Sequence, residues 1–318
     1  MRLAKPFFQL PVLFDVERLQ SEVAALAAEA WVSHPDSLPG NSAARLISAG
    51  GDETDSVHGQ MLATGWLTTM PYVQQVLAGF GVVWSRSRLM RLAPGARVPE
   101  HADINYHWHT RVRLHVPILT RPQVRFHCDG ATVHMAAGEA WIFDNWRRHH
   151  VENGSEADRV HLVADTTGTA AFWRFACGPT PPRAQWRTMP WDPDATPRLL
   201  TESVQQSPIM PAAEVQWLVD DLRAELTMSS DKGPDSGARS ARFGLLLESF
   251  VQDWRQLCAL HGVSGRARPE FERLAFAVHQ AARPLAAGLV MRTNNASALL
   301  VLEKRVLQHL VAADGTGT

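Results

Sequence analysis

Apolar residues in the first part of the chain recur at helical spacing and are interrupted by turn residues. Asp15, which is suited to cap a helix, is followed by three apolar residues at positions i, i+4 and i+7: Leu19, Val23 and Leu26. A second short helix is predicted over 69–77, with Pro71 near its start. We therefore expect residues 1–83 to supply helical and strand elements that pack on a core formed by the following residues.

From Trp84 onwards the pattern alternates, which is the period of a strand with one buried face. In residues 111–118 every second residue is apolar: Val112, Leu114, Val116 and Ile118. Pro117 predicts that the end of this strand lies at an edge or a bulge. Asp129-Gly130 is a strong hairpin signal. The runs predicted as strands are 87–92, 111–118, 123–128, 132–135, 140–143 and 159–165.

Short strands at close spacing, separated by turn residues, favour a jelly roll over a parallel α/β sheet. The chain changes character after Gly178, because residues 179–197 hold six prolines and the remainder has a helical period. Helices are predicted there over 212–226, 243–261, 271–282 and 296–312, with a flexible stretch at 229–240. The expected protein is α+β, with a jelly-roll core over 84–178 and, over 179–318, a linker followed by an all-α domain.

Composition narrows the class of protein further. Hydrophobic residues make up 45% of the 318 residues and charged residues 20%, as in an ordinary globular protein. A formal net charge of −1 gives no electrostatic reason to expect binding to nucleic acid or to a membrane. No stretch approaches the roughly 18 apolar residues of a membrane span. The three cysteines form no CxxC, and the N-terminus lacks a signal-peptide core, so we expect a soluble cytoplasmic protein.

The candidate chemistry centres on His101 and Asp103. On extended backbone, residues i and i+2 point to the same side, so both side chains can bind one metal ion. A second histidine is offered by the His149-His150 pair, 46 residues after Asp103 (149 − 103). Two histidines and one carboxylate are the ligands of a facial triad, which leaves half the coordination sphere of Fe(II) open. Alone, a histidine and an aspartate two apart are usually loop residues, so the interpretation depends on their companions.

Three polar side chains on predicted strands are those companions. Arg159 lies in a strand-like run, where an unpaired guanidinium is costly and where its planar fork suits a carboxylate. Arg113 and His115 lie opposite the apolar row of their strand. Three buried cationic groups need an anion, and the dianion 2-oxoglutarate would supply one. The alternative for Arg159 is an internal ion pair, for example with Asp165 or Asp144.

A competing metal site would use His107-Trp108-His109, which is an HxH like that of cupins. Cupins also need a glutamate a few residues later, whereas Thr110-Arg111-Val112-Arg113 follows here. Other catalytic signatures are missing from the sequence: there is no GxSxG, no GxxxxGK[ST] and no GxGxxG after a strand.

In combination, the motifs resemble the aspartyl/asparaginyl β-hydroxylase family of Fe(II)- and 2-oxoglutarate-dependent oxygenases, which includes bacterial proline cis-hydroxylases. The resemblance covers roughly Leu89 to Gly168. Its motifs are Val98-Pro-Glu-His-Ala-Asp103, Arg111-Val-Arg-Leu-His115, Gly138-Glu-Ala-Trp-Ile-Phe-Asp-Asn145, and His149-His-Val-Glu-Asn153 leading to Arg159-Val-His-Leu162. Vertebrate-type members lack the carboxylate ligand, so Asp103 puts this chain nearer the bacterial branch. The resemblance implies that residues 84–178 form a double-stranded β-helix, the jelly-roll architecture that cupins share.

The resemblance also assigns roles to individual residues. It implies that His101, Asp103 and His149 hold Fe(II), with His149 preferred to His150 because of its spacing from the flanking motifs. It implies that Arg159 pairs with the distal carboxylate of the co-substrate 2-oxoglutarate. Arg113 and His115 would assist in this binding. Candidate substrate contacts beside the ligands are Asn105, Tyr106 and Trp146.

The function implied is a dioxygenase that uses O₂ and 2-oxoglutarate to hydroxylate an amino acid, free or in a peptide. The hydroxylated carbon would be the β-carbon of Asp or Asn, or a proline-type C–H, and succinate and CO₂ would be released. Two alternatives stay open. One is a cupin-like metal-dependent dioxygenase or isomerase that does not use 2-oxoglutarate. The other is an inactive scaffold that senses a ligand.

Overall fold

The structure of the protein, a computed structural model, describes residues 1–33, 38–203, 207–229 and 236–312. Contacts within the chain define two compact units. The first unit comprises Met1–His101 and Thr110–Gln205, and the second comprises Ala102–His109 and Gln206–Thr318. None of the helices in the described ranges combines the length and the apolar composition that a membrane crossing requires.

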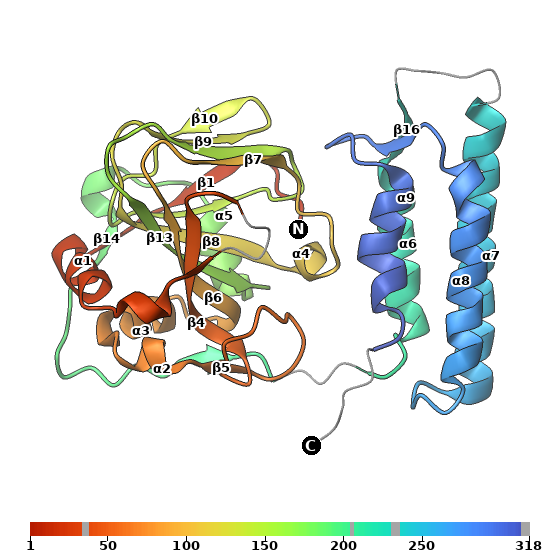
Figure 1. Cartoon of the computed structure of the whole chain (residues 1–318), viewed down its shortest axis with the longest axis horizontal. Helices are drawn as coiled ribbons and strands as arrows, with labels where there is room; N and C mark the ends of the chain where they lie inside the picture. The colour runs from red at the N-terminus through yellow and green to blue at the C-terminus, as the bar shows by residue number, and fades with distance from the viewer. Residues whose placement is uncertain (34–37, 204–206, 230–235, 313–318) are drawn as a thin grey trace. The chain divides into compact units, whose positions relative to one another are not determined.

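The first unit is built on two sheets (Figure 1). In spatial order the larger contains β1 (Phe7–Leu10), β11 (Ala140–Phe143), β8 (Val112–Leu119), β13 (Arg159–Thr166), β6 (Val83–Leu92), β4 (Asn41–Ala49) and β3 (Val32–Ser33). Two short strands flank this order, β5 (Met61–Ala63) beside β4 and β15 (Leu200–Thr201) beside β6. The smaller contains β10 (Ala131–Val133), β9 (Val124–Cys128), β12 (His149–Asn153) and β7 (Arg97–His101).

Successive strands from β6 to β13 alternate between the two sheets, with the β9–β10 hairpin counted as one step. This alternation is the topology of a double-stranded β-helix, so the predicted α+β fold with a jelly-roll core is confirmed. The apolar row of β8 is buried as expected, because Val112, Leu114, Val116 and Ile118 are each 0% exposed. Asp129 and Gly130 have φ values of 48° and 76°, which close the predicted hairpin between β9 and β10.

Pro117 lies in the interior strand β8 at a point where the register with β13 shifts. The predicted bulge is therefore present, and the missing N–H of proline is accommodated there. The pattern did not predict β4, because its Asn-Ser-Ala-Ala-Arg start lacks the β-branched residues typical of strands. The strand is stabilised instead by pairing with β6 along most of its length.

The N-terminal elements pack on the larger sheet. They are α1 (Val16–Ala24), η1 (Ala28–Ala30), α2 (Gly65–Thr68) and α3 (Pro71–Ala78). Asp15 caps α1 by accepting from the N–H of Arg18, as predicted. Glu22 of α1 accepts from the N–H groups at the start of α3, those of Tyr72 at 2.8 Å and Val73 at 3.1 Å. Orphan donors of one helix are thus satisfied by the other, which joins the two helices.

The first unit also contains the segment that follows the core. It holds α5 (Ala170–Cys177), η2 (Arg183–Gln185) and β14 (Arg187–Met189), and β14 pairs in parallel with β2 (Val12–Phe14). The proline-rich stretch is thereby anchored to the N-terminal strands.

The second unit is mainly helical. Its elements are α4 (His107–Thr110), α6 (Ala212–Glu225), α7 (Ser236–His261), α8 (Arg268–Leu285), α9 (Ala298–Val301), the π-helix η3 (Leu302–Val306), the 3₁₀-helix η4 (Leu307–His309) and the paired strands β16 (Leu226–Met228) and β17 (Leu289–Met291). The helices predicted over 212–226, 243–261 and 271–282 are confirmed. The prediction of a flexible stretch over 229–240 was wrong from residue 236 onwards, because α7 begins there. Residues 230–235 of that stretch lie outside the described residues. The single helix at 296–312 was wrong too, because three short helical types replace it.

A buried ion pair holds the short segment 102–109 within this second unit. Arg305 of the π-helix is 2% exposed and donates to Asp221 at 2.8 Å and to the carbonyl of Ile104 at 3.3 Å. His109 places Nδ1 3.7 Å from the same Asp221 carboxylate. Removing one partner of such a pair leaves an uncompensated buried charge, which is far costlier than losing an exposed pair.

We expect Arg305→Met to lower the free energy of unfolding of the second unit by about 3–5 kcal/mol. The matched control is Arg223→Met, which breaks the more exposed pair with Glu248 and should cost at most about 1 kcal/mol. Urea titration followed by hydrogen exchange of α6 and α9 amides measures both. Equal losses in the two variants would contradict the role given to Arg305.

Candidate metal centre and its cavity

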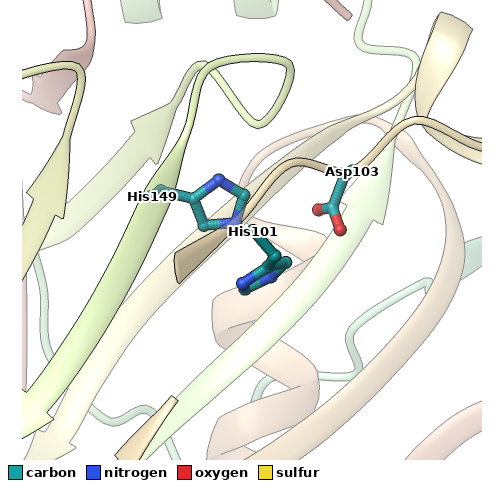
Figure 2. A group of neighbouring side chains, drawn as sticks. All are labelled: His101, Asp103 and His149. Carbon is teal, nitrogen blue, oxygen red and sulfur yellow. The ribbon is translucent and has the colours of Figure 1, made fainter. Parts of the chain in front are cut away.

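Three ligand-type side chains come together where two strands of the smaller sheet meet. His101 is the last residue of β7, Asp103 follows two residues later, and His149 is the first residue of β12. The sheet register pairs His149 directly with His101, and their ring centroids are 4.2 Å apart. One ligand atom from each of the three lies within 4.8 Å of the others, and Figure 2 shows the two imidazoles and the carboxylate gathered together. In the described parts of the chain, this is the group of histidine, cysteine and carboxylate side chains that could hold a metal ion.

Backbone hydrogen bonds orient both histidine rings. Nδ1 of His101 lies 2.8 Å from the carbonyl of Pro99, and Nδ1 of His149 lies 2.9 Å from the carbonyl of Arg147. Since a carbonyl can only accept, each Nδ1 carries the proton, and Nε2 of the neutral ring keeps its lone pair for a metal. Such partners are typical of histidines that bind metals, so the donor set fits Fe(II) or a similar divalent ion.

A cavity of about 310 Å³ opens beside the two histidines, between the sheets. Its polar wall contains His101, His149, Arg113, His115 and Arg159. Most of the remaining wall is apolar: Leu38, Met90, Leu92, Val98, Pro99, Phe126, Phe143, Val151 and Val163. A cavity with a few convergent polar groups on an apolar wall is typical of a small-molecule site.

Arg159, at the start of β13, is a buried guanidinium with incomplete pairing. It is 5% exposed, and its Nη2 lies 2.8 Å from Nδ1 of His161. Its Nε has no hydrogen-bond partner among the described residues. Burial lowers the pKa of Arg159 to about 9, which reflects the cost of keeping this charge away from water. Among the described residues Arg159 forms no ion pair with Asp165 or Asp144, which pair with Arg113 and Arg147 instead. A bound anion would offset the cost of the buried charge.

The two neighbouring histidines are neutral in the folded protein. A guanidinium can only donate, so Nδ1 of His161 accepts from Arg159. Nδ1 of His115 lies 3.4 Å from that same nitrogen. Burial, and then the charge of Arg159, place the pKa of both histidines well below the usual value. The expectation of three buried cationic groups was therefore wrong for His115. Arg113 pairs with Asp165 at 3.1 Å, so its charge is also partly compensated.

These shifted histidines predict acid sensitivity. A histidine that is neutral when folded but titrates near its usual pKa when unfolded binds its proton only on unfolding. Stability is therefore present above that usual pKa and is lost as pH falls below it, by about 1.4 kcal/mol per pH unit for each histidine. In urea titrations of the metal-free protein between about pH 6 and pH 5, His161→Gln should remove one such contribution. An unchanged dependence on pH would show that His161 is charged in the folded protein.

Three predicted substrate contacts are not among the described residues that line the cavity. Trp146 is 1% exposed, its backbone N–H donates to the Asp144 carboxylate, and it is not among the residues that line the cavity. Tyr106 belongs to the second unit, where its hydroxyl donates to Glu214 and its ring stacks on His309 at 5.0 Å. Asn105 is exposed in the same segment. Neither Trp146 nor these two residues lines the described cavity wall.

The two histidine alternatives are also placed. His150 is the next residue of β12, so its side chain points to the opposite face of the strand from that of His149. Its ring stacks on the ring of His127, with the centroids 4.1 Å apart. His107 and His109 lie in α4 of the second unit, and His109 packs on Trp217. Within the described ranges, none of His107, His109 and His150 belongs to a group of side chains that could hold a metal ion. Sequence reasoning missed the cavity residues of β4 and β6, Asn41, Met90 and Leu92, although the last two alternate on one face of a predicted strand.

The chain is similar to known proteins in sequence and in structure. Residues 62–168 match the family model described as aspartyl/asparaginyl beta-hydroxylase, and no curated protein matches the chain. A 2OG-Fe(II) oxygenase family oxidoreductase from Burkholderia pseudomallei is 14% identical with TM-score 0.36, over 49% of this chain and 80% of that one. A prolyl-4-hydroxylase from Pseudomonas putida is 15% identical with TM-score 0.34, over 52% and 95%. A cupin domain from Bordetella pertussis is 19% identical with TM-score 0.21, over 26% and 79%.

The matched segment contains the three triad residues and Arg159. It runs from β5 to just beyond the end of β13 and so includes the strands that alternate between the two sheets. The resemblance inferred from the motifs is confirmed: over residues 62–168 this chain is similar to the aspartyl/asparaginyl β-hydroxylases.

Proposed function

We propose that the protein is an Fe(II)- and 2-oxoglutarate-dependent dioxygenase that hydroxylates an amino acid, free or within a peptide, and releases succinate and CO₂. The observation that carries the proposal is that one cavity is lined by both histidines of the His101–Asp103–His149 group and by the buried guanidinium of Arg159. A metal site alone fits many chemistries. A metal site beside a buried, incompletely paired cation fits a co-substrate that is an anion at both ends.

His101, Asp103 and His149 would hold the iron. When bound, iron with this ligand set can take up a co-substrate and O₂ at its remaining positions. The carbonyl partners of the two histidines fix the rings before the metal arrives, so little reorganisation accompanies binding.

Arg159 would hold the distal carboxylate of 2-oxoglutarate. Its planar guanidinium can donate two parallel hydrogen bonds to a carboxylate, and its Nε has no competing partner among the described residues. Neutral His115 and His161 surround the guanidinium without adding charge, so a single carboxylate can balance it.

The apolar wall has a part in this function as well. Phe126 and Phe143 pack at a centroid distance of 4.8 Å, and both contact the rings of His115 and His149. These rings fix the positions of two polar side chains of the cavity and make this part of its wall apolar, which disfavours water. Excluding water protects the reaction from side reactions while the substrate C–H is held in place.

A substrate screen tests the proposal. The protein is incubated with Fe(II), 2-oxoglutarate, O₂ and a panel of amino acids and peptides, and mass spectrometry follows succinate and a hydroxylated product. The expected result is succinate that forms only with both iron and 2-oxoglutarate, together with one hydroxyl added to a panel member. Product formed equally well without 2-oxoglutarate would contradict the proposal and would favour a cupin-like dioxygenase or isomerase.

A further inference from the structure

Asp103 differs from the two histidine ligands in how its position is fixed. His101 and His149 lie opposite each other on paired strands, and a backbone carbonyl orients each ring. Asp103 follows the last residue of β7 and lies in neither a helix nor a strand. Its segment, residues 102–109, is part of the second unit. Sheet pairing therefore sets the places of the two histidines but not the place of the carboxylate.

Arg305 holds this segment next to Asp103. Its Nε donates at 3.3 Å to the carbonyl of Ile104, which is the residue after Asp103. Its Nη1 donates at 2.8 Å to Asp221, and the same carboxylate lies 3.7 Å from Nδ1 of His109, at the other end of the segment. The side chain of Arg305 is buried, so water does not compete strongly for its donors. A buried planar guanidinium with two partners limits the movement of the backbone beside Asp103.

Tyr106 adds a second point of attachment in the middle of the segment. Its hydroxyl donates to Glu214 of α6, and its ring stacks on that of His309 in η4, with the centroids 5.0 Å apart. Arg305 lies in the π-helix η3, which directly precedes η4. Short π-helical turns are rare and occur frequently at functional sites. Contacts from α6, η3 and η4 thus converge on the segment that carries Asp103.

We infer that Arg305 is a positioning residue for Asp103. Through the carbonyl of Ile104 it fixes the backbone from which the carboxylate ligand projects, as the carbonyls of Pro99 and Arg147 fix the two histidine rings. A ligand already in place loses little conformational freedom when it binds a metal ion, whereas a ligand on mobile backbone must be ordered first. This inference rests on the metal site of the proposed function, and it gives the helical unit a role in how tightly that site binds its metal.

Metal titration of Arg305 variants tests the inference without turnover. Co(II) binds such ligands more tightly than Fe(II), and its visible spectrum reports the number and geometry of its ligands. Arg305→Met should raise the Kd for Co(II) by about 10- to 100-fold, the loss typical when a group that orients a ligand is removed. Arg305→Lys keeps the charge beside Asp221 and should bind Co(II) with intermediate affinity, since an ammonium lacks the planar fork that reaches both partners.

A matched control is needed because Arg305 also stabilises the second unit. Phe271 of α8 is 0% exposed and packs on Trp254 of α7, with the ring centroids 4.8 Å apart. Truncating a buried phenylalanine lowers stability about as much as Arg305→Met is expected to lower it. At a temperature at which circular dichroism shows both variants to be folded, Phe271→Ala should nevertheless keep the Kd for Co(II) within about twofold of that of the unaltered protein.

An equal rise of the Kd in Phe271→Ala and Arg305→Met would overturn the inference, since lost stability alone would then explain both. If Arg305→Met does not fold, Arg305→Lys takes its place, with Phe271→Leu as the milder control.

A double-mutant cycle tests whether Arg305 acts through Asp103. Asp103→Ala leaves the two histidines, which should still bind Co(II), though more weakly. In this background Arg305→Met should change the Kd by less than about twofold, because the ligand that Arg305 positions is missing. The Co(II) spectrum of the single variant Arg305→Met should shift towards that of Asp103→Ala. A further rise of the Kd in the double variant, as large as that in Arg305→Met alone, would contradict the inference.

Succinate assays separate this inference from the proposed function. If the unaltered protein binds Co(II) more tightly than His149→Ala but forms no 2-oxoglutarate-dependent succinate with any compound, the proposed function fails and the inference stands. If the unaltered protein binds Co(II) no more tightly than His149→Ala, both fail. A Kd for Arg305→Met equal to that of the unaltered protein overturns the inference alone.

Discussion

Replacing His149 with alanine is expected to abolish both tight Fe(II) binding and succinate formation. His149 contributes one of the three ligand atoms that lie within 4.8 Å of one another, and Nε2 of its neutral ring is left available by the bond to the Arg147 carbonyl. Changing a group that merely orients a ligand costs about 10–100-fold in metal affinity, so removing the ligand itself should cost at least about 100-fold. Anaerobic titration with Fe(II), or with Mn(II) as a stable substitute, measures the loss.

The matched control is His150→Ala. His150 is the next residue on β12, its side chain points to the other face, and it stacks on His127 with an interplanar angle of 7°. Its removal should leave metal affinity within about twofold, since the ligand set stays complete. If His150→Ala lost the metal and His149→Ala kept it, the assignment of the second histidine would be wrong.

The second large effect is expected for Arg159→Met, which should raise the KM for 2-oxoglutarate by about 100-fold or more. The variant loses up to two charge-assisted hydrogen bonds to the distal carboxylate, each worth about 1.5–3 kcal/mol. Methionine keeps an unbranched apolar stem, so the cavity wall stays filled. Initial rates at varied 2-oxoglutarate, with Fe(II) saturating, give the constant.

The stability of the Arg159→Met variant distinguishes co-substrate binding from a structural role for Arg159. Arg159 is buried with an incompletely paired charge, and burial lowers its pKa to about 9. Without a bound anion the charge is a liability, so Arg159→Met should leave the metal-free protein at least as stable as the unaltered one. A large loss of stability together with an unchanged KM would show that Arg159 serves the fold instead of the co-substrate.

Much of the candidate site could be predicted from sequence because its determinants are local. His101 and Asp103 are two residues apart, and their common side follows from extended backbone. Arg159 shares a strand face with Val163, and both line the cavity. The assignment of His149 required non-local information, since its place beside His101 depends on pairing between β12 and β7. The family motifs supplied that non-local step.

Charge compensation could not be predicted, because it depends on strand order. Asp165 pairs with Arg113 and Arg86 only because β13 lies between β8 and β6 in the sheet. The low pKa of His115 follows from burial and from the charge of Arg159, and neither can be taken from sequence spacing. Arg45 likewise pairs with Glu53 and Asp55 from a strand that intrinsic propensity does not favour.

The helical part shows a similar division. Apolar periodicity predicted α6, α7 and α8 because those helices are long and amphipathic. It predicted one helix over 296–312, where the chain instead forms an α-helical turn, a π-helix and a 3₁₀-helix. The buried Arg305 sits in that π-helix, bonded to Asp221 and Ile104. Such tertiary contacts override the local period there.

The central claim is that the triad and Arg159 act together on one co-substrate. It is tested most directly by anaerobic calorimetric titration of 2-oxoglutarate into the protein with and without Fe(II). A ligand held at both ends should bind one-to-one and at least about tenfold more tightly when iron is present, because each end then adds its own contribution. Equal affinity with and without iron, or no binding in either case, would contradict the account.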